Sequence, residues 1–558
     1  MEDRPLIAQG DQTLLLDVHA TGFDEARAEL SAFATLEKSP EHFHTYRLDA
    51  LSLWNAASAG LSVDGVMACL KRWSRYELPG SLDESIRSIM ARFGQIVMSE
   101  GDNQDTLRLS CDDRFVRAEM LGNRKLKGLL RPDGEGFTIG LTDRGTVKRE
   151  LVKTGWPVLD EAPLTEGDPL PLNLKQVCAR GAFGLRPYQE DAVKAFTGRG
   201  LPGTGYGVVV MPCGAGKTIV GMACMAAIGM KTLIITTNVA AVHQWMDELL
   251  DKTDLEPADL GEYTGAAKEV RPVTIATYQV LTWRPDKDAD FPHFHLFRRE
   301  KWGLIIYDEV HLLPAPVFMV VAEIQAIRRL GLTATLIRED GNQDDVFSLI
   351  GPKRYDVPWK DLESKGFIAE AFCREIRVSM RDHDRLRYVS SKPRERHRIA
   401  AENEVKLRVV RDIIANHRED LVMVIGQFLD QLHLLAKELK APLITGATPN
   451  AERERLYALF RSGAVQVLVV SKVANFAIDL PDASVAIQVS GTFGSRQEEA
   501  QRLGRILRPK AKNSYFYSIV SRYTVEEEFA DNRRRFLTEQ GYRYNIEAWE
   551  ESEWAPSN

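Results

Sequence analysis

The segment formed by residues 208–223 restricts the fold of this chain of 558 residues more than any other stretch. Residues 208–210 are three valines, a β-branched run that is typical of a buried parallel strand. Residues 219–223 are mainly apolar and are predicted to continue as a helix. Between them lies Met-Pro-Cys-Gly-Ala-Gly-Lys-Thr, residues 211–218, so the segment predicts a strand, a tight loop and a helix.

The residues of this loop are suited to holding phosphate. Gly214 and Gly216 let backbone N–H groups approach and point at phosphate oxygens, with the positive end of the helix behind them. Lys217 would reach the β- and γ-phosphates of a nucleotide, and Thr218 would hold Mg²⁺. The strict pattern begins with glycine where this chain has Met211, which we interpret as a loosened first turn. The candidate nucleotide-binding residues of the loop are Gly214, Ala215, Gly216, Lys217 and Thr218.

Two carboxylates follow a second apolar run, residues 304–307. This run predicts a buried strand that delivers Asp308 and Glu309 to the carboxyl edge of the sheet, where ligands of open α/β folds bind. Asp308 would hold Mg²⁺, and Glu309 would orient and deprotonate the attacking water. An ordinary acidic helix cap is the alternative interpretation. His311 and the Leu-Thr-Ala-Thr sequence at residues 332–335 argue against it.

A second half-site for the same nucleotide lies far along the chain. Residues 501–508 read Gln-Arg-Leu-Gly-Arg-Ile-Leu-Arg. A phosphate-binding loop needs such an arginine pair to stabilise the charge that develops on the γ-phosphate. A chain that carries both halves is predicted to close on ATP.

These motifs, taken in order, resemble those of superfamily 2 helicases. The series also includes Gly-Leu-Arg-Pro-Tyr-Gln at residues 184–189 and Thr-Ile-Ala-Thr-Tyr at 274–278. Arg-Glu-Asp at residues 338–340 resembles a motif of the XPB helicases, as does Tyr-Ser-Ile-Val-Ser at 517–521 with the tail that follows it. The matches cover about the last two-thirds of the chain, and the front portion is similar to the amino-terminal region of bacterial XPB proteins.

The resemblance implies roles for individual residues. Gln189, helped by Arg186, would read the adenine edge, while Thr333 and Thr335 would couple the nucleotide state to the grip on nucleic acid. Arg505 and Arg508 would be arginine fingers, with Gln501 at the phosphate or attacking water. Further contact or coupling residues would be Thr277, Arg338, Glu339, Asp340 and Asp479. The chain departs from the family at Ala474 and Asn475, where most members have glycine and an acidic residue.

The formal net charge of −7 argues against a chain that coats nucleic acid indiscriminately, so binding would have to be local. Residues 533–535 are three arginines, and residues 381–400 carry a second basic stretch. Such runs are usually solvated faces. The second stretch, however, follows the first motor lobe at the position of the basic protrusion called the thumb in XPB proteins. Its cations are Arg385, Arg387, Lys392, Arg394, Arg396 and Arg398.

The hydrophobic pattern predicts several domains. Residues 1–95 form a small mixed α/β domain with a strand at 14–18 and helices at 23–36, 61–73 and 82–93. Residues 104–159 form a second unit, with strands at 107–110 and 137–141 and helices at 114–121 and 144–153. By position it resembles the damage-recognition domain of XPB helicases, but a folded spacer is an equal alternative. Residues 160–180 are predicted to be a linker.

Alternating strands and helices predict two RecA-like lobes, each a doubly wound parallel sheet. Lobe 1 comprises residues 181–350, with a strand at 232–236 and a helix at 240–250. Lobe 2 comprises residues 351–558, with strands at 421–425, 465–470 and 485–489 and a helix at 431–439. The predicted fold class is therefore α/β, with two motor lobes preceded by small mixed α/β domains.

Apolar stretches stay shorter than the roughly twenty residues needed to cross a bilayer, and the start is not a secretory leader. We therefore expect a cytoplasmic protein, nucleoid-associated if bacterial. The six cysteines occur singly, which predicts neither a zinc site nor a disulfide framework.

Three functions fit this sequence. The first is an ATP- and Mg²⁺-dependent DNA helicase of XPB type, with 3′ to 5′ polarity implied by the resemblance, acting in DNA repair on single-stranded or forked DNA with a nuclease or other repair protein. The second is a double-stranded DNA translocase or an RNA helicase of the same superfamily. The third is an ATP-gated nucleic-acid clamp, against which Lys217, Glu309 and Arg505 argue because a clamp needs no water-activating carboxylate.

Overall fold

The computed structural model describes residues 4–549 with internal gaps. The gaps are 31, 39–41, 59, 104–105, 141–142, 162–165, 199–204, 213, 287–291, 294–299, 311–325, 335–345, 347–348, 352, 358–361, 364, 368–370, 472–482, 491–512 and 540–543. The chain forms two compact units, one made mainly of residues 1–356 and the other mainly of residues 357–558. Within the described residues, none of the helices is long and apolar enough to cross a membrane.

The front of the chain forms an antiparallel sheet with strand order β1-β2-β4-β3. The predicted helix over 23–36 is wrong in its second half, because α1 ends at Leu30 and residues 35–38 form a strand. Phe33 and Ala34 are buried in the turn between them, so their helix-like spacing from Leu30 reflects burial in a turn. The elements are β1 Leu6–Ala8, β2 Thr13–Asp17, α1 Phe23–Leu30, β3 Thr35–Lys38, β4 Phe43–Arg47, α2 Ala50–Ser58, α3 Val63–Trp73 and α4 Gly80–Met90.

A second small sheet follows, with strand order β7-β8-β6-β5-β9. Its predicted strands and helices are confirmed within one or two residues. The guanidinium of Arg144 binds both carboxylate oxygens of Asp160, at 3.0 and 2.6 Å, and fastens α6 to β9. The elements are β5 Ile96–Glu100, β6 Thr106–Cys111, α5 Arg114–Gly122, β7 Arg131–Asp133, β8 Gly136–Gly140, α6 Arg144–Lys153 and β9 Val158–Asp160.

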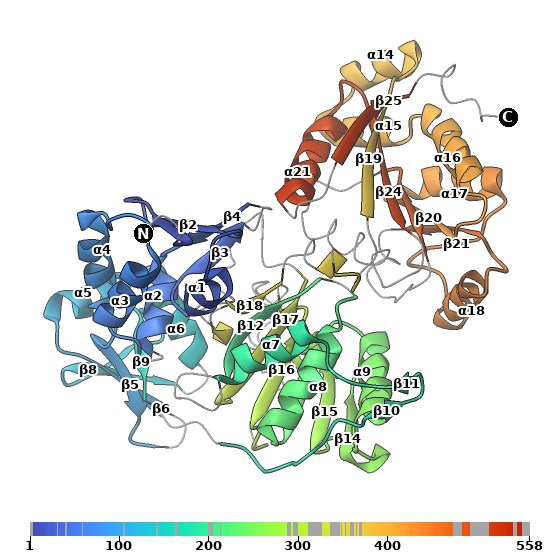
Figure 1. The fold of residues 1–558 in the computed structure, drawn as a ribbon. Coiled ribbons are helices and arrows are strands. Elements are labelled where there is room, and N and C mark those ends of the chain that lie inside the picture. The colour runs from blue at the N-terminus through green and yellow to red at the C-terminus, as the bar shows by residue number, and fades with distance from the viewer. Residues whose placement is uncertain are drawn as a thin grey trace. The chain divides into compact units, whose positions relative to one another are not determined.

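Lobe 1 is a seven-stranded, fully parallel sheet with strand order β14-β15-β13-β16-β17-β12-β18 (Figure 1). The predicted valine run lies in β12, and the helix predicted after the glycine loop is α8. The elements are β10 Val177–Cys178, β11 Gly181–Ala182, α7 Pro187–Thr197, β12 Tyr206–Val210, α8 Lys217–Ile228, β13 Thr232–Thr236, α9 Val239–Lys252, η3 Pro257–Asp259, β14 Leu260–Tyr263, β15 Val273–Thr277, α10 Tyr278–Leu281, β16 Leu304–Asp308, β17 Arg328–Thr333 and β18 Lys353–Asp356.

Lobe 2 repeats this architecture as a second parallel sheet of seven strands, ordered β21-β22-β20-β23-β24-β19-β25. Together the two sheets confirm the predicted fold class. The elements are β19 Ala371–Val378, α14 Asp382–Ser390, α15 Pro393–Ala401, α16 Val405–Asn416, β20 Val422–Gly426, α17 Leu429–Leu439, β21 Leu443–Ile444, α18 Asn450–Arg461, β22 Val467–Ser471, β23 Val485–Gln488, β24 Ser514–Ser521, α21 Val525–Glu539 and β25 Tyr544–Ala548.

Candidate functional site

The glycine loop leaves the carboxyl end of β12 and enters α8 at Lys217. Gly214 and Gly216 have φ angles of 81° and 83°, in the left-handed region that favours glycine. A β-carbon at Gly216 would also lie 2.5 Å from the side-chain nitrogen of Gln189, which excludes any larger residue without rearrangement. The first N–H groups of α8 have no partner within the helix and can bind an anion, so the local structure fits the predicted phosphate site.

Lys217 lies beside Glu309 in lobe 1. The distance from Lys217 Nζ to Glu309 Oε1 is 3.7 Å, and the two side chains are only 12% and 24% exposed. Glu309 follows β16 with a φ of 53°, which is uncommon for a residue with a β-carbon, and strained backbone of this kind clusters at functional sites. The structure therefore brings together the predicted phosphate-binding lysine and the predicted general base, and the carboxylate balances the charge of the lysine.

Asp308 is held by three hydrogen bonds. Trp245 Nε1 donates to Asp308 Oδ2 at 3.0 Å, the backbone N–H of Glu309 donates to Oδ1 at 3.1 Å, and the Tyr278 hydroxyl donates to the Asp308 carbonyl oxygen at 3.0 Å. Trp245 belongs to α9 and Tyr278 opens α10, and both are almost fully buried. The carboxylate is thus fixed in orientation by the indole of Trp245, which the sequence motifs do not indicate, and by the backbone of Glu309, while Tyr278 holds the backbone of Asp308.

Burial, and next the neighbouring carboxylate of Glu309, raise the pKa of Asp308 to about 6, although the hydrogen bond from Trp245 favours the ionised form. Below that pH the carboxyl group takes up a proton and loses the charge that a cation requires. Mg²⁺ would therefore compete with a proton at Asp308 as the pH falls toward 6.

The oxygen groups near the loop suit Mg²⁺. This ion prefers oxygen ligands, keeps several waters and is usually bound through one or two carboxylates together with substrate phosphates. Asp308 offers an oriented carboxylate at the end of β16, and Thr218 offers a hydroxyl in the first turn of α8. Across the described parts of the chain, no three His, Cys, Asp or Glu side chains group as metal ligands.

Strand β17 separates the loop strand from the acidic strand. Asp308 of β16 pairs with Leu332, and Val210 of β12 pairs with Thr333. Thr333 ends β17 and is fully buried between these neighbours. A threonine predicted to sense the nucleotide state thus lies between the two strands that deliver the phosphate loop and the carboxylates.

Gln189 connects the start of α7 with the glycine loop. Its Oε1 accepts a hydrogen bond from the backbone N–H of Arg186 at 2.9 Å, and the side chain is 2% exposed and lies against Gly216. Arg186 donates to the Tyr188 hydroxyl at 3.1 Å. The adenine-reading role of Gln189 and Arg186 stays a prediction, as does coupling by Thr277, whose Oγ1 accepts from the N–H of Val280 and caps α10.

The predicted contacts of the second half-site lie outside the described residues, so their roles stay predictions. The same holds for the helicase motifs that follow β16 and β17 and for the loop in which the chain departs from the family. These residues are His311, Thr335, Arg338, Glu339, Asp340, Ala474, Asn475, Asp479, Gln501, Arg505 and Arg508.

The basic stretch at 381–400 forms the helix pair α14 and α15 of lobe 2. Arg398 forms ion pairs with Glu402 and Asp430, and Arg396 donates to the carbonyl oxygens of Ser391 and Val389 at 3.1 Å each. Lys392 is exposed, and the side chain of Arg394 is not among those described. Arg396 and Arg398 therefore have structural partners within lobe 2, and their contact with nucleic acid stays a prediction.

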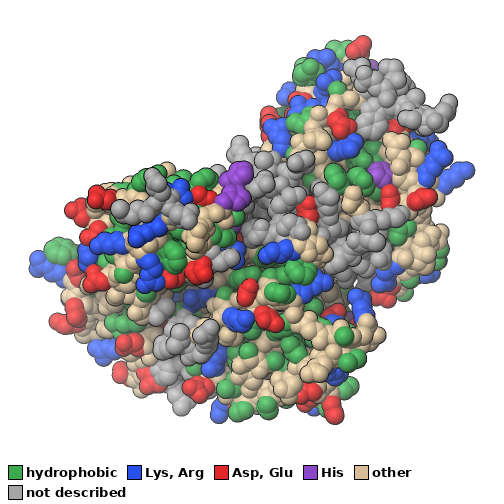
Figure 2. All heavy atoms as spheres, viewed as in Figure 1, with side chains coloured by type: hydrophobic (Ala, Val, Ile, Leu, Met, Phe, Trp, Pro, Cys, Tyr) green, Lys and Arg blue, Asp and Glu red, His purple; other side chains and the backbone are tan. Residues whose placement is uncertain are grey.

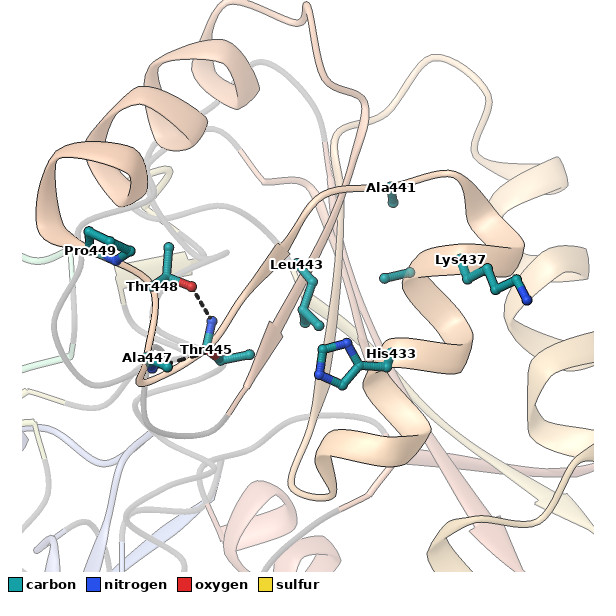
Figure 3. Close-up of a pocket in the computed structure, with 9 residues that line it drawn as sticks. His433, Lys437, Ala441, Leu443, Thr445, Ala447, Thr448 and Pro449 are labelled. Atoms are coloured by element: carbon teal, nitrogen blue, oxygen red, sulfur yellow. Dashed lines mark hydrogen bonds between the residues drawn. The ribbon is translucent and has the colours of Figure 1, made fainter.

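A pocket of about 580 Å³ opens in lobe 2 beside α17 and the segment from β21 to α18 (Figure 3). Thr448 Oγ1 accepts from the N–H of Thr445, and Thr445 Oγ1 from the N–H of Ala447, so the segment forms a closed polar turn. None of the residues predicted to bind nucleotide or nucleic acid lines this pocket. Its lining residues are His433, Ala436, Lys437, Ala441, Leu443, Thr445, Ala447, Thr448 and Pro449.

Comparisons with known proteins support the helicase interpretation. Residues 362–553 match the ERCC3/RAD25/XPB C-terminal helicase family, residues 182–338 match the res subunit of type III restriction enzymes, and residues 6–133 match a helicase conserved C-terminal domain. A solved ATP-dependent Type ISP restriction-modification enzyme bound to DNA shares the fold. Its TM-score is 0.50 at 14% identity, over 66% of this chain and 32% of that chain.

Curated relatives match along the whole chain. The DNA 3'-5' helicase XPB of Mycobacterium tuberculosis is 50% identical over 98% of both chains. That of Kineococcus radiotolerans is 50% identical over 98% of this chain and 97% of its own. The general transcription and DNA repair factor IIH helicase/translocase subunit XPB of Encephalitozoon cuniculi is 32% identical over 98% of this chain and 83% of its own. The chain therefore belongs to the XPB family of superfamily 2 DNA helicases.

Proposed function

We propose that this XPB-type DNA helicase uses Mg²⁺-ATP to move 3′ to 5′ along one DNA strand and separate the duplex during DNA repair. The observation that carries the proposal is the pairing of Lys217 with Glu309 at 3.7 Å, next to the oriented carboxylate of Asp308, in a chain 50% identical over its length to DNA 3'-5' helicases. A nuclease or other repair protein as its partner stays a prediction.

We assign phosphate binding, proton acceptance and metal binding to side chains of lobe 1. Lys217 and the N–H groups that open α8 would bind the phosphates, and that contact would replace part of the ion pair between Lys217 and Glu309. Freed from the lysine, Glu309 would accept the proton of the attacking water. Asp308 and Thr218 would hold Mg²⁺, which when bound neutralises charge on the β- and γ-phosphates.

Lobe 2 would complete the nucleotide site. Arg505 and Arg508 would stabilise the charge that develops on the γ-phosphate, and Gln501 would contact that phosphate or the attacking water. Binding and release of ATP would then draw the lobes together and let them separate. Contacts from Thr277, Thr333, Thr335, Asp479 and the 338–340 motif would convert this cycle into steps along the strand.

Translocation on duplex DNA without strand separation is the second candidate function. It is favoured by the name of the Encephalitozoon cuniculi relative, a helicase/translocase subunit. The two functions differ in the polymer that stimulates ATP hydrolysis. A helicase that tracks one strand requires single-stranded or forked DNA, whereas a duplex translocase is fully stimulated by blunt duplex.

The test is ATP hydrolysis by the full chain with no nucleic acid, single-stranded DNA, blunt duplex, forked DNA or single-stranded RNA, at two salt concentrations and with Mg²⁺ or EDTA. Stimulation by single-stranded and forked DNA, with unwinding of a duplex that carries a 3′ tail but not one with a 5′ tail, is expected. Stimulation by blunt duplex without unwinding would favour translocation. Stimulation by RNA alone, or by none of the polymers, would refute the proposed function.

Trp245→Phe should weaken metal binding while ATP binding without metal stays unchanged. The indole N–H is the donor that orients Asp308 Oδ2 and favours its ionised form. Loss of such an outer-shell hydrogen bond typically costs about 10- to 100-fold in metal affinity. The measurement is the Mg²⁺ concentration that gives half-maximal hydrolysis, together with binding of a fluorescent ADP with and without Mg²⁺. Trp302→Phe is the matched control, because Trp302 is equally buried and lies beside Lys231.

A further inference from the structure

A large aromatic side chain is exposed in lobe 2 on a strained turn. Tyr523 lies between β24 and α21, its φ is 58°, and 74% of its surface is exposed. A left-handed φ is costly for a residue with a β-carbon and is suited to glycine. Exposure means that packing of the ring does not offset this cost, and backbone strain of this kind clusters at functional sites.

The turn is fixed in place by its neighbours. The backbone N–H of Val525 donates to the Tyr388 hydroxyl of α14 at 2.8 Å, and the buried Thr524 hydroxyl donates to the carbonyl oxygen of Ser521 at 2.7 Å. The guanidinium of Arg385, also on α14, lies 5.5 Å from the centre of the Tyr523 ring. The ring is therefore held beside a cation on a rigid support while most of its surface faces solvent.

Helix α14 and the start of α15 present exposed cations on this surface. None of the residues of α14 is buried, and Arg385, Arg387 and Lys392 are exposed. Among the side chains that the structure describes, no Asp or Glu forms an ion pair with these three cations, whereas Arg381 and Arg398 of the same helix pair bind Glu404 and Glu402. The acidic residues of α14, Asp382 and Asp384, occupy its first turn, where their negative charge interacts favourably with the helix dipole.

Apolar side chains are exposed on the same helix. Leu386 and Val389 are 74% and 65% exposed. Figure 2 shows hydrophobic and basic side chains side by side at the end of lobe 2 where Figure 1 places α14. An aromatic ring beside an arginine, together with further cations that have no carboxylate partner, is complementary to an unpaired nucleotide, whose base has an apolar face and whose phosphate is an anion.

We propose that Tyr523 and Arg385 form a stacking site for one unpaired base of the DNA strand, with Arg387 and Lys392 at the adjacent phosphates. The proposal rests on the DNA helicase function and adds a strand-binding site outside the helicase motifs. The base would stack on the exposed face of the ring, and Arg385 would contribute a cation–π contact. Because every base has such a face, this contact would not depend on sequence. It would require a base that is free of its partner.

The test compares a substitution that removes the ring with one that keeps it. Tyr523→Gly removes the aromatic side chain and suits the left-handed backbone, so the fold is retained. Tyr523→Phe keeps the ring. Binding of fluorescently labelled single-stranded, forked and blunt duplex DNA is measured by anisotropy. Tyr523→Gly should weaken binding of single-stranded and forked DNA about 5- to 150-fold, the range for loss of one stacked base. Tyr523→Phe should bind as the wild type does, and duplex binding should change little.

The contribution of the exposed cations to DNA binding is tested with separate variants. Arg387→Gln should reduce single-strand affinity and lower the slope of log affinity against log salt by about 1, because one phosphate-directed cation is lost. Arg381→Gln is the matched control from the same helix pair, since Arg381 is already paired with Glu404. Hydrolysis of ATP without DNA should be unchanged in all four variants.

The outcomes separate this site from the proposed function. Normal stimulation of hydrolysis by DNA, together with wild-type binding of single strands by Tyr523→Gly, would refute the stacking site and leave the helicase function intact. Equal losses on single-stranded and duplex DNA would also refute stacking. A wild-type protein whose hydrolysis does not respond to DNA would refute the proposed function, and with it this site.

Discussion

Glu309→Gln should lower the rate of DNA-stimulated ATP hydrolysis by about 10²- to 10⁴-fold, the usual contribution of a general base. The amide has the size of the carboxylate but cannot accept the proton of the attacking water. ATP affinity should stay the same or rise, because the carboxylate now 3.7 Å from Lys217 Nζ no longer competes with the phosphates for the lysine. Steady-state hydrolysis and binding of a fluorescent ATP analogue measure the two effects.

Lys217→Ala is the control for this experiment, because it should remove nucleotide affinity. The two variants thus separate catalysis from binding at neighbouring side chains. If Glu309→Gln hydrolyses ATP within about tenfold of the wild-type rate, a different group must accept the proton. If it fails to bind ATP, Glu309 is needed for the shape of the site and the base assignment is wrong.

Arg505→Ala should slow hydrolysis by about 10³-fold or more while ATP binding stays nearly intact, as is typical of arginine fingers. A finger contacts charge that develops only in the transition state, so its loss affects the rate more than the affinity. Single-turnover hydrolysis with the enzyme in excess and equilibrium binding of ATP measure these two quantities.

Arg505→Lys provides the matched comparison, since it keeps a positive charge but lacks the planar fork of the guanidinium. An intermediate rate is expected. Arg508→Ala compares the second arginine of the same motif. Wild-type hydrolysis by Arg505→Ala would contradict the mechanism in which the two lobes share one nucleotide.

The motor lobes are predicted well because their strands are buried on both faces. Continuous apolar runs such as 232–236 and 485–489 allow few alternatives to a central parallel strand, and they form β13 and β23. The front domain is less predictable. Phe33 and Ala34 fit the helical spacing from Leu30 but lie in a turn, because tertiary burial gives an apolar residue the same signature in a turn as in a helix.

The candidate site likewise contains residues that the sequence predicts and one that it does not. Lys217 and Glu309 are indicated by local motifs, and the parallel sheet brings them together at one edge. Trp245 is 63 residues from Asp308 in the sequence and contributes through a single indole N–H. A tryptophan inside a predicted amphipathic helix is expected to be core, so its polar contact becomes visible only when the fold brings this side chain of α9 to the end of β16.

The basic stretch at 381–400 shows that the number of cations in a sequence segment does not tell which of them are available for binding. Arg385, Arg387, Arg396 and Arg398 are adjacent in sequence and predict one patch. In the structure, Arg396 and Arg398 bind groups of lobe 2, whereas Arg385 and Arg387 remain exposed. Which cation finds a partner depends on the position of carboxylates and carbonyl groups from other elements, such as Asp430 of α17.

The position of β17 sets the distance between the two groups that are predicted to contact the nucleotide in lobe 1. The phosphate loop and the acidic pair are carried by strands separated by this one strand, so their separation is two strand spacings of about 4.8 Å each. At Gly331 of β17 a β-carbon would lie 3.1 Å from Val310 and 3.2 Å from Val208, so side chains pack closely over this strand and leave little room for a larger residue. The hydrogen bonds of the sheet therefore fix the distance between the phosphate loop and the carboxylates, and we expect this distance to stay constant through a cycle in which other contacts form and break.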